Sequence, residues 1–162
     1  MTIWSVGLTT RASAARASKW GGVACLFQGA REALGSLLTV SLAGKPLDNV
    51  IAYLIGASLL PILLLVAGIR LWRHAGWIWG GVAGVIVASE LAAALFAPEA
   101  VTNAYTPIMA KVAPSPSIAA EAAMLASFAV KIAILGFITN GIRGALALRR
   151  VDYSNNVLGS LS

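Results

Sequence analysis

Four long apolar stretches, separated by shorter polar or basic segments, run through this chain at residues 20–43, 50–69, 77–97 and 118–142. Each stretch has about 20 residues or more, and a helix of that length spans a hydrocarbon core about 30 Å thick. The pattern therefore predicts an all-α integral membrane protein, built as a bundle of four transmembrane helices.

The four stretches differ in how continuously apolar they are, and the third is the most regular. The second contains Pro61 near its middle, where we expect a kink. The first contains Gln28, Arg31 and Glu32 at its centre. An alternative for this first stretch is therefore that it lies at the membrane interface, or enters and returns, instead of crossing.

The chain divides into three parts around these stretches. Residues 1–19 form a basic N-terminal arm, residues 20–147 the four-helix transmembrane domain and residues 148–162 a C-terminal tail. Within the transmembrane domain, residues 98–117 form a long outer loop that contains several prolines and serines. The pair Thr106-Pro107 is typical of the start of a short helix, which would rest on the membrane surface.

Basic residues are distributed unequally between the segments that join the spans. Because cytoplasmic segments carry the excess of Lys and Arg, both termini are predicted to be cytoplasmic. A first stretch that did not cross would put the basic arm on the wrong side, which favours four crossings. The predicted cytoplasmic side has Arg11, Arg16, Lys19, Arg70, Arg73, Arg143, Arg149 and Arg150, with the interfacial tryptophans Trp20, Trp72, Trp77 and Trp79, against Lys45 and Lys111 in the other loops.

Composition favours lipid as the surrounding medium. Hydrophobic residues make up 59% of the chain and charged residues 11%, and the mean hydropathy is +0.84. A soluble domain has about 25% charged residues. The net charge of +6 is therefore assigned to membrane topology, and no nucleic-acid partner is predicted.

The N-terminal arm places apolar residues before basic ones, the reverse of a secretory signal, so we expect it to be retained. We assign the protein to a bacterial inner membrane as a multi-pass protein. The mitochondrial inner membrane is the alternative, because the arm contains Arg and Ser and no acidic residue precedes Glu32, as in a transit peptide.

Ionisable residues inside the apolar stretches are the main functional clue. A charge near the bilayer centre costs about 2.5–3.5 kcal/mol on insertion scales, so Arg31, Glu32, Glu90 and Lys131 need partners or a wet surface. Their formal charges sum to zero. We predict that Lys131 pairs with Glu32 or with Glu90, and that Gln28, one helical turn before Glu32, joins the same cluster.

Small residues mark a second feature, a helix-packing stripe in the third span. They recur at every fourth position, a spacing that allows another helix backbone to approach closely. Glu90 lies on a different side of this helix, so we expect one side to pack within the chain and the other against a second copy or another membrane subunit. The stripe consists of Gly76, Gly80, Gly84, Ala88 and Ala92.

Residues with catalytic or metal-binding chemistry are scarce. His74 is the sole histidine and Cys25 the sole cysteine, which excludes a two-histidine haem site, an HExxH helix and an intrachain disulfide. Gly80, Gly81 and Gly84 have the spacing of a nucleotide-binding loop but lie in an apolar helix with no strand before them. We predict no enzymatic activity, no metal and no cofactor.

Two functions remain after these exclusions. The first is a non-enzymatic assembly or accessory subunit of a larger or homo-oligomeric membrane complex, in which the buried charges specify helix contacts. The alternative is a small transporter or channel in which Glu90, Glu32 and Lys131 handle a proton or an ion. Only Pro61 suggests the broken helices that transporters use, so we favour the first.

Overall fold

The computed structural model describes residue 8 and residues 10–43 and 47–159, with side chains throughout except at 42–43, 47–57, 104 and 151–159. All regular structure in these residues is α-helical, which confirms the predicted fold class at that level. The helices are α1 (Arg11–Ala43), α2 (Leu47–Trp72), α3 (Trp77–Phe96), α4 (Pro98–Met109) and α5 (Pro116–Gly159).

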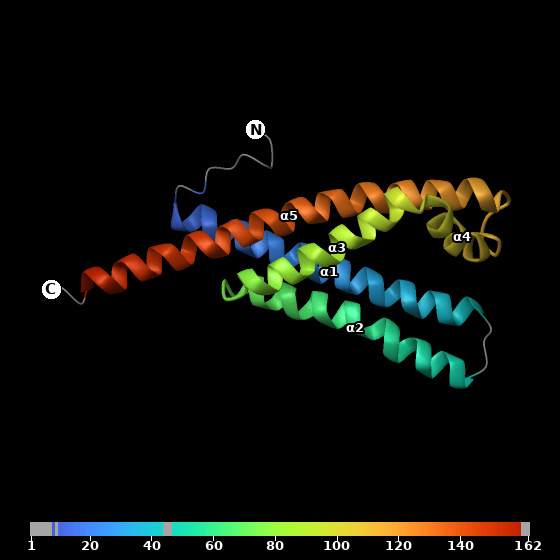
Figure 1. Cartoon of the computed structure of the whole chain (residues 1–162), viewed down its shortest axis with the longest axis horizontal. Helices are drawn as coiled ribbons and strands as arrows, with labels where there is room; N and C mark the ends of the chain where they lie inside the picture. Colours follow the sequence, from blue (N-terminus) through green and yellow to red (C-terminus); the bar gives the residue numbers. More distant parts are fainter. Residues whose placement is uncertain (1–7, 9, 44–46, 160–162) are drawn as a thin grey trace.

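The four long helices alternate in direction along the molecule (Figure 1). The start of α1, the turn between α2 and α3 and the end of α5 lie at one end, and α4 lies at the other. Helix α1 packs along both α2 and α5, while α3 packs along α5 and α2 and so closes a four-helix ring. The short helix α4 packs on α5.

Several helix boundaries differ from those expected. Helix α1 begins at Arg11, so the second half of the basic arm is helical, and α5 continues through the expected tail to Gly159. The first of these segments is rich in alanine and arginine, which are strong helix formers outside an apolar environment too. The outer loop is helical from Pro98, a favourable first helical position, and Pro107 lies within α4.

The buried core is small and mostly aliphatic. Leu64, Leu71, Val87 and Ile138 are fully buried, and the core joins α1, α2, α3 and α5. Many large apolar side chains instead face outwards, which is unfavourable in water over so large an area. These exposed residues include Phe27, Leu34, Leu37, Leu38, Leu59, Ile62, Ile78, Val85, Leu95, Phe96, Ile118 and Leu125.

Two helices among the described residues are long and apolar enough to cross a membrane, Trp77–Phe96 and Pro116–Arg150. Only 22% and 17% of their most apolar windows are buried inside the protein, unlike the core helix of a soluble protein. Ser58–Trp72 is a shorter apolar segment. Helix α1 is less apolar because polar residues 28, 31 and 32 interrupt it, and two of the four predicted crossings therefore remain predictions.

Candidate functional site

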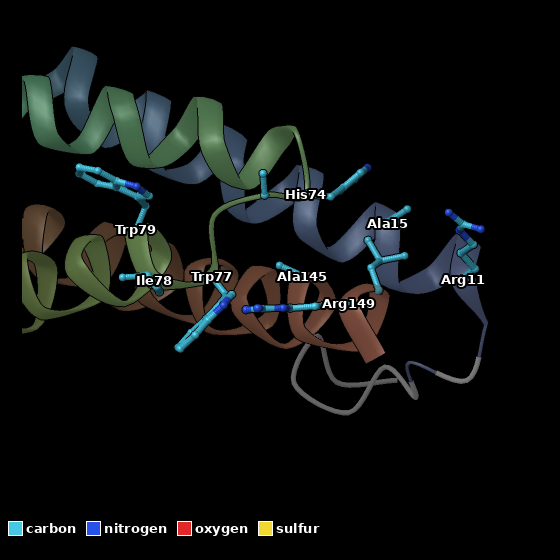
Figure 2. A pocket seen from close by; sticks show the side chains of 10 residues that line it. Arg11, Ala15, His74, Trp77, Ile78, Trp79, Ala145 and Arg149 are labelled. Carbon is cyan, nitrogen blue, oxygen red and sulfur yellow. The ribbon is translucent and has the colours of Figure 1, made fainter. Parts of the chain in front are cut away.

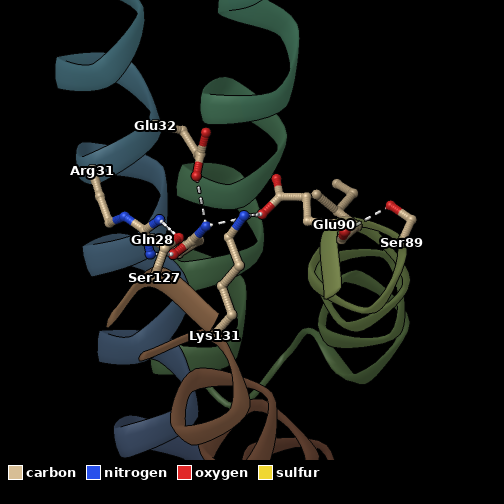
Figure 3. A network of polar contacts seen from close by, with 8 residues as sticks. Gln28, Arg31, Glu32, Ser89, Glu90, Ser127 and Lys131 are labelled. Carbon is tan, nitrogen blue, oxygen red and sulfur yellow. Dashed lines mark hydrogen bonds and ion pairs between the residues drawn. The ribbon is translucent and has the colours of Figure 1, made fainter. Parts of the chain in front are cut away.

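The five residues predicted to form a cluster lie together where α1, α3 and α5 meet (Figure 3). We call Gln28, Arg31, Glu32, Glu90 and Lys131 the charged cluster. The first three come from α1, where spacings of three and four residues put them on one helix face. Glu90 comes from α3 and Lys131 from α5, so the cluster connects three helices that are far apart in sequence.

An ion pair connects α3 with α5 within the cluster. Lys131 Nζ lies 2.8 Å from Glu90 Oε2, and the two side chains are only 15% and 17% exposed. Of the two pairings that the sequence left open for Lys131, the structure thus contains the one with Glu90. At this burial the pair is shielded from water, so removing either partner leaves an uncompensated charge.

Gln28 is the central hydrogen-bonding residue of the cluster and is fully buried. Its Nε2 donates to Glu32 Oε1 at 2.8 Å and to Glu90 Oε2 at 3.2 Å. Its Oε1 accepts from Arg31 Nη1 at 3.4 Å. One amide therefore links both carboxylates to a guanidinium, a role that needs both a donor and an acceptor on the same side chain.

Ser127 on α5 also belongs to this network, although the predicted cluster did not include it. Its Oγ accepts a hydrogen bond from Arg31 Nη2 at 2.5 Å. Ser127 lies four residues before Lys131 and hence on the same face of α5. That spacing was the signal that could have placed the hydroxyl beside the charges.

The cluster is electrostatically balanced, since two cations face two carboxylates and the polar side chains bond to one another. Such a fully connected network fixes which helix faces meet. Within the part of the chain that the structure describes, no group of three His, Cys, Asp or Glu side chains is placed to hold a metal ion.

A cavity of about 170 Å³ lies beside the ion pair, between α3, α4 and α5. Glu90 and Lys131 line it together with Tyr105 and Met124. A second cavity of about 430 Å³ lies next to it, nearer to α4, and contains the carboxylates Glu99 and Glu121. Met124 lines both cavities.

The predicted packing stripe on α3 is used only in part. A Cβ added to Gly80 would lie 2.7 Å from Ile142 and 3.1 Å from Leu71, so this glycine packs against α5 and α2. At Gly84 the nearest atom would be 3.8 Å away, and Ala88 is exposed. The start of the stripe is therefore a close intrachain contact, Gly84 lies at an ordinary van der Waals distance from Ile138 of α5, and only Ala88 further along is exposed.

The closest helix crossings involve glycines that sequence analysis did not select. A Cβ on Gly21 would lie 2.6 Å from Gly141 Cα, at the crossing of α1 and α5. A Cβ on Gly22 would lie 2.8 Å from the carbonyl oxygen of Gly68, at the crossing of α1 and α2. The adjacent pair of glycines in α1 thus lets two neighbours approach on two sides, and that doublet was the available sequence signal.

No protein-family model matches the chain, and neither curated proteins nor solved structures give a match.

Proposed function

We propose that this chain is a non-enzymatic assembly or accessory subunit of a larger or homo-oligomeric complex in a bacterial inner membrane, in which the charged cluster specifies helix contacts. The observation that carries the proposal is the neutral, mutually hydrogen-bonded network that joins α1, α3 and α5 through Gln28 and the Lys131–Glu90 pair. Polar side chains inside a membrane are most stable when they bond across helices. A network in which every polar side chain is bonded stabilises one relative alignment of these helices over alternative alignments.

The proposal places four helices, α1, α2, α3 and α5, across the bilayer with both termini in the cytoplasm. Their alternating directions (Figure 1) and the many outward-facing apolar side chains support this placement. Basic residues at the end that contains the start of α1 and the α2–α3 turn are consistent with a cytoplasmic face.

An open face of α3 supports association with a second helix from outside the chain. Val85 is 71% exposed and Ala88 is also exposed, while a Cβ added to Gly81 would meet nothing within 4 Å. These positions lie about one helical turn apart on one side of α3. Small residues on an uncovered transmembrane face allow a partner helix to approach closely.

Charge removal at the ion pair tests the proposed role. Lys131→Met and Glu90→Gln each leave a buried charge without its partner, which costs about 3–5 kcal/mol. We expect each single variant to reduce the amount of membrane-inserted protein and of its assembled form in native gels. The double variant should recover part of both, because it removes both charges together.

The control is Glu121→Gln, which removes an exposed carboxylate of α5 and should leave abundance and assembly unchanged. If Glu90→Gln accumulates and assembles like the unmodified protein, the charged cluster does not specify helix contacts and the proposal is wrong.

The second candidate function is a small proton- or ion-coupled transporter that uses Glu90, Glu32 and Lys131. The cavity beside the ion pair and the adjoining acidic cavity with Glu99 and Glu121 favour it, because carboxylates that line successive cavities are typical of ion pathways. In proteoliposomes with an imposed pH gradient, this function predicts a flux that Glu90→Gln abolishes while assembly remains intact.

A further inference from the structure

A cavity of about 750 Å³ lies at the opposite end of the molecule from α4. It opens between the start of α1, the turn between α2 and α3, the first turn of α3 and the C-terminal half of α5 (Figure 2). None of the charged-cluster residues lines it. The lining residues that matter here are Arg11, His74, Trp77, Ile78, Trp79 and Arg149.

The lining combines positive charge with amphipathic rings. Arg11 and Arg149 line it from two different helices. Figure 2 shows the side chain of Arg149 running toward the ring of Trp77, whereas Arg11 lies at the other side of the cavity, beyond Ala15. Lys19 lies close enough to act electrostatically on His74. Among the described residues, those that line the cavity include no carboxylate.

His74 is held in an unusual way at the edge of this cavity. Its φ is 60°, in the left-handed region that few residues other than glycine and asparagine adopt. Its Nδ1 is buried and has no hydrogen-bond partner among the described residues.

We propose that this cavity binds the phosphate headgroup of an anionic phospholipid of the cytoplasmic leaflet. Guanidinium groups are well suited to phosphate, and basic pockets between membrane helices on the cytoplasmic side are a recurring way to bind such headgroups. Tryptophan rings at the same level are typical of the membrane interface. The proposal depends on the membrane placement given above but not on the role of the charged cluster.

The apolar continuation of the cavity favours a lipid over a soluble phosphate. Ile78 lines the cavity and is 61% exposed. Val82, which follows one helical turn later on the same face of α3, is 37% exposed. An acyl chain attached to a phosphate in the cavity would run along this face, whereas a small anion would leave most of the volume unfilled.

Native mass spectrometry of the protein released from nanodiscs tests the proposal. With nanodiscs of equal parts phosphatidylglycerol and phosphatidylcholine, we expect the protein to retain one phosphatidylglycerol in preference to phosphatidylcholine. Arg149→Gln should weaken this retention about fivefold, the effect of one basic residue at a membrane surface. Arg149→Lys, which keeps the charge, should retain most of the binding.

The matched control is Arg150→Gln, which removes the same charge from the next residue of α5, exposed and outside the cavity. An equal loss in both variants would indicate general surface attraction and would overturn the site. Displacement of the lipid by added inorganic phosphate would overturn the lipid assignment in favour of a soluble phosphate. If the protein enters nanodiscs but retains neither lipid in preference to the other, this inference alone is wrong. If the protein fails to enter nanodiscs, the membrane placement is wrong as well.

Discussion

Replacement of Gly21 by alanine should separate α1 from α5, since it adds a methyl group where the two backbones touch. The new Cβ would lie 2.6 Å from Gly141 Cα and 3.0 Å from the carbonyl oxygen of Phe137. Both contacts are with backbone, which cannot rotate away. To restore an ordinary distance of 3.4 Å the helices must move apart by 0.8 Å, that is 3.4 minus 2.6.

The energetic cost follows from the packing that this movement loses. A gap of about 0.5–1 Å forfeits a quarter to a half of the dispersion energy of the contacts concerned, and overpacking of a filled interior costs about 1–3 kcal/mol. Gly35→Ala is the matched control in the same helix, because a Cβ there meets nothing within 4 Å. Both variants gain the same helix propensity, so the difference between their free energies of unfolding gives the cost of overpacking, about 1–3 kcal/mol.

The assay is unfolding in mixed micelles at increasing mole fractions of sodium dodecyl sulfate, followed by circular dichroism. We expect Gly21→Ala to unfold at a lower fraction of the denaturing detergent than the unmodified protein, and Gly35→Ala at an equal or higher fraction. Equal stability of the two variants would refute a close crossing of α1 and α5 at this glycine.

Three further predictions use the same unfolding assay. Gln28→Leu removes the donor shared by both carboxylates of the charged cluster. The variant should lose about 2–4 kcal/mol of unfolding free energy, since unpaired buried charges are left behind. A stability equal to that of the unmodified protein would contradict the role of Gln28 as the link between the two carboxylates. Ser18→Ala deletes the 2.6 Å hydrogen bond from Ser18 Oγ to the carbonyl oxygen of Leu71 and should lower the free energy of unfolding by about 1 kcal/mol. A variant more stable than the unmodified protein would contradict this prediction. Burial, and secondarily the charge of Lys19, lowers the pKa of His74 from its ordinary value of 6.5, so the unfolded chain takes up this proton first and stability falls as the pH drops below 6.5. In His74→Asn the new residue tolerates the φ of 60°, and the variant should lose less Tm than the unmodified protein between neutral and mildly acidic pH. If both proteins lose the same Tm, groups other than His74 cause the pH dependence.

The sequence was sufficient to predict helices and the groups that need partners. An apolar run interrupted by Glu90 or Lys131 identifies a charge that must be paired, because lipid cannot solvate it. The participation of Gln28 followed from its position one turn before Glu32. The choice of Glu90 as the partner of Lys131 did not follow, because periodicity along one helix shows its faces but not which helix lies opposite.

The same limit explains the glycines. The regular stripe on α3 was easy to detect, yet α3 packs through only part of it, at Gly80. Close crossings of α1 occur at Gly21 and Gly22, two adjacent residues that have no periodic spacing and instead face different neighbours. A repeat detects one extended face, whereas a helix at the centre of a bundle needs small residues in several directions.

The pairing of Glu90 with Lys131 has a consequence for how the protein is made. Synthesis runs from the N-terminus, so α3 and its carboxylate leave the ribosome before α5 and its ammonium group. Until α5 arrives, the nascent chain holds the Glu90 carboxylate without its counter-ion, and α1 lacks the neighbour that fits against Gly21. With the membrane placement proposed above, release from the insertion machinery should therefore wait for α5, and a ribosome stalled before it would leave an intermediate prone to degradation.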